Sequence, residues 1–267
     1  MPTPESATKT IDLAGLHVVV TRPRGQEQKL CQLIEAAGGV SLHYPVLEIE
    51  DSPAPAPQLQ QLTQFDLLIF ISPNAVARGM NLINAHGGLP VGILTATVGR
   101  GSGRELKRIL GRAPDIVPTA QFNSEGLLAL PQMQQMRGKR VLIIRGEGGR
   151  ELLAETLRQR GAEVEYAEVY RRSRPKADNA TLLHAWARNE IDIIVVTSGE
   201  GLRNLYEMVG QLGRQWLRKT PVLVINERLL QLAQELGLEQ SPIIAAEASD
   251  EGIVAALDAW HRGKTHA

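Results

Sequence analysis

The sequence predicts an α/β fold made of two doubly wound parallel sheets. Three observations point to it: short apolar runs alternate with amphipathic helical segments, one such unit recurs along the chain, and the chain is long enough for two domains. Strand and helix in regular alternation are typical of parallel sheets with helices on both faces. A chain of 267 residues, of which 43% are hydrophobic, can bury two cores of ordinary size.

The clearest unit lies in residues 138–175. Residues 141–144 are apolar and rich in β-branched side chains, which suits a strand buried on both faces. Glycines within 146–149 permit a turn, and leucines at helical spacing follow over 151–161, where a glycine ends the helix. The start of this helix therefore faces the loop that follows the strand.

The same pattern occurs earlier, at residues 15–39. Two further pairs of segments extend the match, 65–76 with 191–202 and 123–130 with 249–257. Pairs that recur in the same order indicate an internal duplication.

The rest of the chain continues the alternation, interrupted by the proline-rich segment 52–58. Prolines so closely spaced indicate a break between elements, and we place a domain boundary there. The other expected strands are 17–21, 41–51, 67–71 and 115–118, and the other expected helices are 26–37, 74–84, 102–110 and one that begins near Ser124, with the second copy repeating this order from residue 139.

Composition restricts the classes of partner. Basic and acidic residues number 29 each, so any anion site must be local. Cys31 is the only cysteine, which excludes an intrachain disulfide, and its place in an amphipathic helix indicates a packing role. The first residues are too polar for a signal peptide, and no apolar run approaches the ~20 residues of a membrane span. We expect a cytoplasmic monomer that binds neither nucleic acid nor membranes.

Parallel sheets of this kind bind ligands beyond the carboxyl ends of their strands, where loops and helix N-termini gather. In both halves these loops are rich in glycine, hydroxyl residues and arginine. On one interpretation, the hydroxyls only cap helices and the glycines only permit turns. On the other, both sets of loops bind one large polyanion. The candidate binding residues are Arg22, Ser72, Asn74, Gly99, Ser102, Ser124, Arg145, Gly146, Arg150, Thr197, Ser198, Asn226 and Arg228.

The sequence carries no common cofactor or metal motif. The glycine-rich segments at 99–105 and 145–151 lack the spacing of a dinucleotide fingerprint and the lysine of a P-loop. The six histidines are scattered without the spacing of metal ligands, and no nucleophile elbow occurs. We expect neither a cofactor nor a metal.

Tyr170 lies in an alternating segment, 164–175, which resembles another at 42–53; both end at proline, and two such strands could pair between the domains. Two interpretations of Tyr170 are open. It packs a β-ribbon beside solvated arginines, or it donates a proton at the mouth of a cleft, where a phenol with a pKa of ~10 is neutral near pH 7.

Taken together, these segments resemble the uroporphyrinogen-III synthase family. The resemblance covers nearly the whole chain, and its motifs are degenerate singly but specific in order and spacing, whereas the fold alone would license no function. The motifs are VVVTRPRGQ, LLIFISPNAV, TVGRGSGREL, NSEGLLAL, VLIIRGEGGRELLAETLRQRGAEVEYAEVYRR, IIVVTSGEGLRNL and INERLLQLAQELG.

The resemblance implies two flavodoxin-like domains that do not follow the sequence halves. One would contain 1–41 with 175–267 and the other 51–164, joined by a two-stranded β-ladder of 42–50 and 165–174. It also implies an enzyme of heme biosynthesis that closes hydroxymethylbilane, a linear tetrapyrrole polycarboxylate, into uroporphyrinogen III. Ring D is inverted and water is lost, and no cofactor takes part.

Site roles also follow from the resemblance. The family's mechanistically implicated tyrosine matches Tyr170, which would act as the general acid that helps hydroxide leave. Asn74 stands where some members have arginine, and residues 226–228 stand where others have glycine and threonines. The hydroxyl positions that the family places in its cleft are matched by Ser72, Ser102 and Ser198.

Two other functions remain open. A bilobed binding or sensor protein would close on a small anion without chemistry, but the chain shows neither an export signal nor a helix-turn-helix segment. A sugar-transferring enzyme with two facing sheets is disfavoured by the small size of the chain and by the lack of an acidic nucleotide-sugar site.

Overall fold

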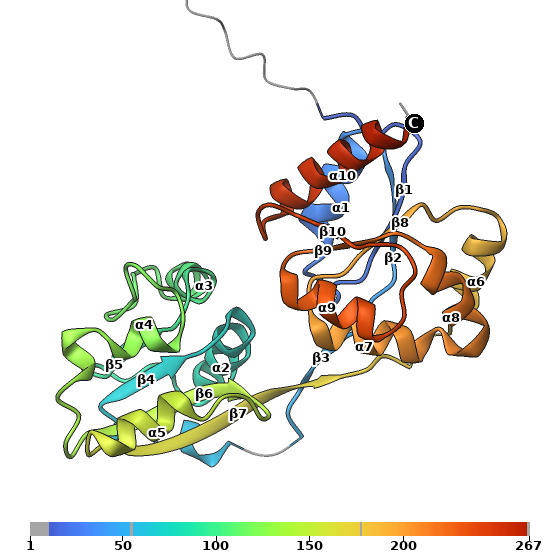
Figure 1. The fold of residues 1–267 in the computed structure, drawn as a ribbon. Helices are drawn as coiled ribbons and strands as arrows, with labels where there is room; N and C mark the ends of the chain where they lie inside the picture. Colours follow the sequence, from blue (N-terminus) through green and yellow to red (C-terminus); the bar gives the residue numbers. More distant parts are fainter. Residues whose placement is uncertain (1–10, 54–55, 177, 266–267) are drawn as a thin grey trace, which may run out of the picture. The chain divides into compact units, whose positions relative to one another are not determined.

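The computed structural model describes residues 11–53, 56–176 and 178–265. The chain forms two compact units, and Figure 1 labels their helices and strands. The central unit is Ile49–Arg172, and the discontinuous unit joins the chain up to Glu48 with the chain from Ser173 onward.

The central unit contains a sheet in the order β3-β7-β6-β4-β5. The pairs β7·β6, β6·β4 and β4·β5 are parallel. The four residues of β4 are all buried, as expected for a strand covered on both faces. The strands are β3 (Glu48–Asp51), β4 (Leu67–Phe70), β5 (Leu94–Thr97), β6 (Arg140–Gly146) and β7 (Glu163–Ser173).

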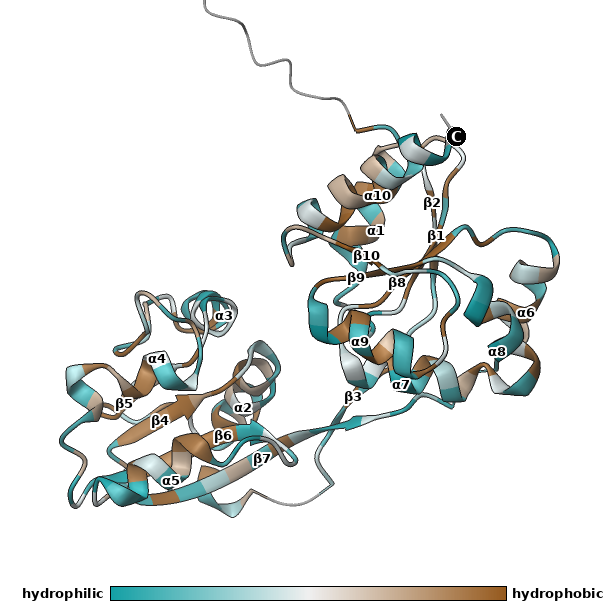
Figure 2. Cartoon of the chain, viewed as in Figure 1, coloured by the Kyte–Doolittle hydropathy of each residue, from teal (hydrophilic) through white to brown (hydrophobic). Residues whose placement is uncertain are grey.

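Helices cover both faces of this sheet because the side chains of β4 alternate. Leu68 and Phe70 pack with α2 and α3, whereas Leu67 and Ile69 pack with α4 and α5. Figure 2 shows the apolar residues concentrated in β4 and β6. The helices are α2 (Pro73–Ala85), α3 (Arg100–Leu110), α4 (Ser124–Leu128) and α5 (Leu152–Gln159), with single 3₁₀ turns η1 (Pro57–Gln60), η2 (Leu62–Gln64) and η3 (Pro131–Met133).

The discontinuous unit contains a second sheet, in the order β10-β9-β8-β1-β2, in which each neighbouring pair is parallel. The strands are β1 (His17–Val20), β2 (Val40–His43), β8 (Ile193–Val195), β9 (Val222–Val224) and β10 (Ile243–Ile244).

Two apolar clusters lie on the two faces of this second sheet. One joins α1 and α10 to Val18 and Val20, and the other joins the remaining helices to Val19. Cys31 is half-buried against the first cluster, which is a packing position. The helices are α1 (Gln28–Ala36), α6 (Ala180–Ala187), α7 (Gly199–Met208), α8 (Gly210–Lys219), α9 (Glu227–Glu235) and α10 (Asp250–Thr265).

The prediction of an α/β fold with parallel sheets is confirmed, but segment 42–50 differs from the single strand expected there. It contains the end of β2, which pairs with β1, and then β3, which lies beside β7 in the other sheet. Residues 44–47 between them are buried. An alternating pattern fits the edge strand of either sheet, so the pattern alone did not reveal the interruption.

Segment 165–174 neighbours β3 on one side, as a ladder strand would, but it also pairs on its other side. Most of it is part of β7, which pairs with β6 as far as Tyr170 and therefore belongs to the central sheet. The strand expected at 115–118 is only an isolated bridge between Ala96 and Ile116, and β5 was not predicted. In the described part of the chain, no helix has the length and apolar character needed to cross a membrane.

Candidate functional site

In the central unit, the loop between β4 and α2 places a serine at the carboxyl edge of the sheet. Ser72 has extended backbone and caps α2, because its Oγ accepts a hydrogen bond from Ala75 N at 3.0 Å. The same Oγ lies 3.1 Å from the hydroxyl of Tyr170. Asn74 is half-buried in the first turn of α2. A hydroxyl pair, Ser72 with Tyr170, therefore lies at the start of this helix.

Tyr170 is buried, which agrees with the packing interpretation and not with a proton donor exposed at the mouth of a cleft. Its exposed fraction is 2%. Gly146 is its partner across β6 and β7, and a Cβ atom at 146 would lie 2.5 Å from the tyrosine ring. Gly146, predicted as a binding residue, is itself buried and instead leaves the space that the ring occupies.

Arg145 was predicted to bind substrate, but its charge is already paired within the unit. Its Nη1 donates to Glu151 Oε1 at 2.9 Å, and its Nε lies 3.4 Å from Glu168 Oε1. The guanidinium also stacks on the Tyr166 ring, 4.1 Å from its centroid. With 5% of its surface exposed, Arg145 holds the surrounding loop and does not offer a free charge.

The neighbours of Arg145 show how tightly this cluster is coupled. Burial raises the pKa of Tyr166 to about 12, and its hydrogen bond to the Glu151 carboxylate adds to the effect. That hydrogen bond and the one from Arg145 lower the pKa of Glu151. The proton therefore stays on the phenol and the negative charge stays on Glu151.

Two predicted hydroxyls of the central unit are not helix caps. Ser102 lies inside α3, because the helix begins at Arg100 with Gly99 as its cap. Its side chain is buried. Ser124 is the first residue of α4, and the cap is Asn123, whose Oδ1 accepts from Gly126 N at 2.7 Å. α3 therefore starts earlier than the expected residue 102, whereas α4 starts at Ser124, as expected.

Ser124, Arg145 and Arg150 come together around a small cavity of about 170 Å³. Gly148 and Gly149 form part of its wall. The Arg150 side chain is 75% exposed, and its Nη1 lies 3.3 Å from a Glu125 oxygen. Of these arginines, Arg150 has the exposure that a binding residue needs.

In the discontinuous unit, a cavity of about 400 Å³ lies at the carboxyl ends of β8 and β9. Four predicted residues line it: Thr197, Ser198, Asn226 and Arg228. Ser198 Oγ caps α7 by accepting from Gly201 N, and Asn226 Oδ1 caps α9 by accepting from Leu229 N, both at 3.0 Å. Two helix N-termini therefore meet at one cavity.

The charges around this cavity include one that the sequence reasoning missed. Arg203 lines the wall with Arg228, and Glu200 and Glu235 lie there too. The Arg203 guanidinium folds back over Gly199, since a Cβ atom at 199 would lie 3.6 Å from its Nη1. The cationic and anionic side chains of the wall are therefore equal in number. The two helix N-termini add a partial positive charge, which favours binding of an anion.

Arg22 lies elsewhere in the discontinuous unit and is already paired. Its Nη1 lies 2.5 Å from Asp250 Oδ1, and both side chains are 16% exposed. Its backbone carbonyl also contacts His43 Nε2 at 2.8 Å. Arg22 therefore ties the loop after β1 to the start of α10, which does not support its predicted role in binding.

The described residues offer no cluster of side chains suited to a metal ion. They contain no group of three or more His, Cys, Asp or Glu side chains that could hold a metal ion.

Comparisons with known proteins agree with one another. The profile of the family described as Uroporphyrinogen-III synthase HemD matches residues 28–255. Uroporphyrinogen-III synthase of Escherichia coli K12 is 35% identical over 250 residues, which are 91% of this chain and 100% of that protein. The enzyme of the same name from Salmonella typhimurium LT2 is 36% identical over 248 residues, again 91% of this chain and 100% of the relative.

Solved structures show the same fold. A mutant uroporphyrinogen III synthase of Thermus thermophilus has a TM-score of 0.61 at 22% identity, covering 95% of this chain and 100% of that one. The synthetase of Helicobacter pylori 26695 has a TM-score of 0.59 at 17% identity, with 90% and 97% covered. At such identities, these structures support the fold alone.

Proposed function

The chain belongs to the uroporphyrinogen-III synthase family, and from this premise we propose that it closes hydroxymethylbilane into uroporphyrinogen III, with inversion of ring D and loss of water. The observation that carries the proposal is 35% identity across the full length of the Escherichia coli enzyme. This reaction serves porphyrin and heme biosynthesis, and the enzyme is a lyase.

We propose that the substrate carboxylates bind at the carboxyl edges of both sheets. In the discontinuous unit, Thr197, Ser198, Asn226 and Arg228 line one cavity with two helix N-termini, which supports an anion-binding role. In the central unit, the half-buried or exposed candidates are Ser72, Asn74, Gly99, Ser124 and Arg150. Arg22 and Arg145 are not included, because carboxylates of this chain already pair with them.

The connection between the units fits the proposed two-domain organisation. The chain passes from one unit to the other beside Glu48 and again beside Ser173. Those positions lie in β3 and β7, which are neighbours in one sheet, and Arg171 Nη2 is 2.7 Å from Glu50 Oε2 there. We take β3 and β7 as the two-stranded ladder that joins the domains.

Loss of the substrate hydroxyl as water requires a proton, and we propose that Tyr170 supplies it through Ser72. Burial of Tyr170 argues against direct contact with substrate, whereas Ser72 is only half-buried. The Ser72 hydroxyl would give its proton to the departing hydroxide and receive the proton of Tyr170 across their 3.1 Å hydrogen bond. The proton released when the closed ring becomes aromatic again would restore the phenol.

Binding must also fold the flexible substrate so that ring D attacks through the inverted position. Holding the reacting carbons in contact is itself a large contribution to rate. We assign this task to the carboxylate-binding loops of both units, since each loop fixes the position of the groups it binds.

A product assay tests the proposed function. With hydroxymethylbilane supplied enzymatically, the protein should yield the type III isomer, which chromatography separates from the type I isomer of spontaneous closure. A reaction without protein gives the type I background. Output that stays entirely type I would refute the enzyme proposal, and tight substrate binding without turnover would then indicate a binding protein.

A further inference from the structure

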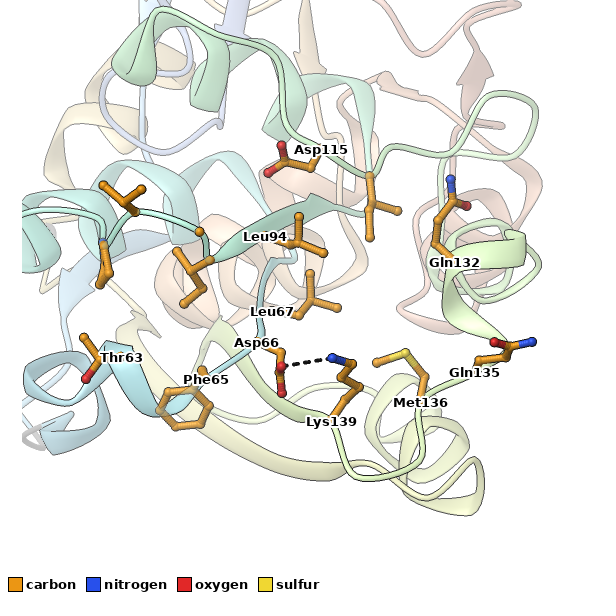
Figure 3. A pocket seen from close by; sticks show the side chains of 15 residues that line it. Thr63, Phe65, Asp66, Leu67, Leu94, Asp115, Gln132, Gln135, Met136 and Lys139 are labelled. Carbon is orange, nitrogen blue, oxygen red and sulfur yellow. Dashed lines mark hydrogen bonds and ion pairs between the residues drawn. The ribbon is translucent and has the colours of Figure 1, made fainter.

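A second hollow lies in the central unit, at the opposite edge of its sheet from the loops described above. It has a volume of about 600 Å³ and is shown in Figure 3. It forms where the strands begin: Asp66 precedes β4, Leu94 is the first residue of β5, and Lys139 precedes β6. The four residues of β4, a span of about 13 Å, separate it from Ser72.

The lining of this hollow is largely apolar and partly exposed. Leu67, Ile116 and Met136 are nearly fully buried and form its floor. Figure 3 shows Leu67 beside Leu94, its partner across the two strands. Leu94 is 47% exposed and Val91 is fully exposed. Exposed apolar side chains gathered around a hollow, in contrast to scattered ones, are typical of a binding site.

The carboxylates in the wall are already hydrogen-bonded within the protein. Asp66 Oδ2 accepts from Arg140 N at 2.8 Å, and its Oδ1 pairs with Lys139 Nζ at 3.1 Å, as the dashed line in Figure 3 shows. Asp115 Oδ2 accepts from Thr95 N and Thr95 Oγ1, each at 2.8 Å. These contacts reduce the capacity of both carboxylates to bind a cationic ligand.

The hydrogen-bond donors of the wall, in contrast, can still bind an acceptor group of a ligand. The Lys139 ammonium has three N–H donors, of which the bond to Asp66 uses one. Gln132 and Gln135 also reach the hollow, and within the described part of the chain their amides make no hydrogen bond. A ligand that fits this wall needs an apolar body and an acceptor group, best a negative one, near Lys139.

We propose that this hollow binds a small molecule with an apolar ring body and a carboxylate group. Its volume lies within the range of about 300–1,000 Å³ common for small-molecule sites. Because it opens at the amino ends of the strands, its occupant would not compete with a substrate bound at the carboxyl ends. The inference does not depend on the function proposed above.

The test uses naphthalene-1-acetate as the probe and its neutral counterpart, naphthalene-1-acetamide. Isothermal titration of the full chain at pH 7 and low salt should give saturable binding of the acid with a Kd below about 1 mM. The amide should bind about tenfold more weakly, since it cannot form a charge-assisted hydrogen bond to Lys139. Absence of binding by the acid at millimolar concentration would overturn the proposal.

Three variants test whether the probe binds in this hollow. Lys139→Met removes the charge but keeps the aliphatic stem, and should reduce the affinity for the acid to that for the amide. Leu94→Glu puts a carboxylate into the hollow at a half-exposed position and should abolish binding of both probes, whereas Leu212→Glu, at a site 58% exposed in the other unit, should change neither. Circular dichroism checks folding. Unchanged binding in folded Leu94→Glu would place the probe elsewhere and refute the assignment.

Discussion

Gly146 and Tyr170 are partners across β6 and β7, and the tyrosine ring fills the space where a side chain at 146 would stand. A Cβ atom built at Gly146 would lie 2.5 Å from the ring carbons Cε2 and Cζ. The register shifts by one residue just before this pair, since Arg145 faces Glu168 whereas Gly146 faces Tyr170. The shift turns Tyr170 toward Ser72 and gives the glycine a definite structural role.

Gly146→Ala is therefore expected to push the ring away from Ser72. Because the sheet is tightly packed there, the change should lower the free energy of unfolding by about 1–3 kcal/mol and reduce the rate of type III formation. Urea unfolding followed by far-UV circular dichroism measures the first effect. All three tryptophans lie in the discontinuous unit, so their fluorescence would not report directly on this site.

Gly263→Ala is the matched control for that substitution. Gly263 lies in α10, and nothing lies within 4 Å of a Cβ atom built there. Alanine has the higher helix propensity, so this variant should be as stable as the parent or more stable. Equal stability of Gly146→Ala and the parent would contradict the close contact with Tyr170.

The proton route through Ser72 predicts non-additive losses. Tyr170→Phe keeps the ring in place and removes the hydroxyl, and should slow turnover by about 10²–10⁴-fold. Ser72→Ala should have a comparable effect, and the double variant should be little worse than either single variant, because both interrupt one route. Single-turnover rates of type III formation measure all three variants.

Two outcomes would count against this route. Multiplying losses in the double variant would show that the hydroxyls act independently. Full activity in Tyr170→Phe would assign the proton to another donor. Since Ser72 also caps α2, Ser72→Thr is a useful companion variant, because it retains both the cap and a hydroxyl.

The general fold followed from the sequence because buried parallel strands have a strong local signature. The apolar run at 141–144 and the glycine that ends the following helix are visible without tertiary information. The split of 42–50 between two sheets is not visible in this way. Its first part, in β2, pairs with β1 across the intervening helix α1, and its second part, in β3, lies beside the distant strand β7. Pairing partners of that kind depend on tertiary contacts.

The burial of Tyr170 shows why site residues were harder to predict than strands. Regular alternation would place Ala167 and Val169 on one face of β7 and Tyr170 on the other. The register shift instead brings all three into one apolar cluster. A shift of this kind leaves no clear mark in the alternating pattern.

The arginines illustrate a related limit. Position at a strand end correctly indicated that Arg145 lies at the carboxyl edge, but its partners Glu151 and Glu168 come from a helix start and a neighbouring strand. Arg203 was missed because it lies within α7, outside the strand-end loops. Whether an arginine is free or paired depends on these tertiary neighbours.

Arg203 and Arg228 should each contribute to substrate affinity if the cavity of about 400 Å³ binds carboxylates. Arg203→Met and Arg228→Met are expected to raise KM about three- to tenfold, with a smaller change in kcat. The effect should shrink as salt is added, because these side chains are exposed. Steady-state kinetics at two ionic strengths provides the measurement.

Arg188→Met is the control for both arginine variants, since Arg188 is exposed at the end of α6 in the same unit and lies outside the cavity. It should leave KM unchanged. If all three variants behaved alike, the effect would reflect overall charge and not the cavity.

Asp66 makes the stability of the central unit depend on pH in a defined direction. The backbone N–H of Arg140, followed by the Lys139 ammonium, lowers the pKa of this carboxyl. A carboxylate with a lowered folded-state pKa stabilises the fold above its unfolded pKa of ~3.9, and that contribution is lost as the pH falls through the folded-state pKa. Asp66→Asn should therefore destabilise the protein at pH 7, and the penalty should stay the same down to about pH 4 and shrink below it.

Urea unfolding of Asp66→Asn and the parent at several pH values between 7 and 3 measures this dependence, again by far-UV circular dichroism. Glu239→Gln is the control, because Glu239 is an exposed carboxylate of the other unit. Its unfolding curve should track that of the parent at every pH. If the penalty for Asp66→Asn were the same at every pH, the charge of Asp66 would not contribute to stability. The geometry of its hydrogen bond from Arg140 N would then be what holds the starts of β4 and β6 together.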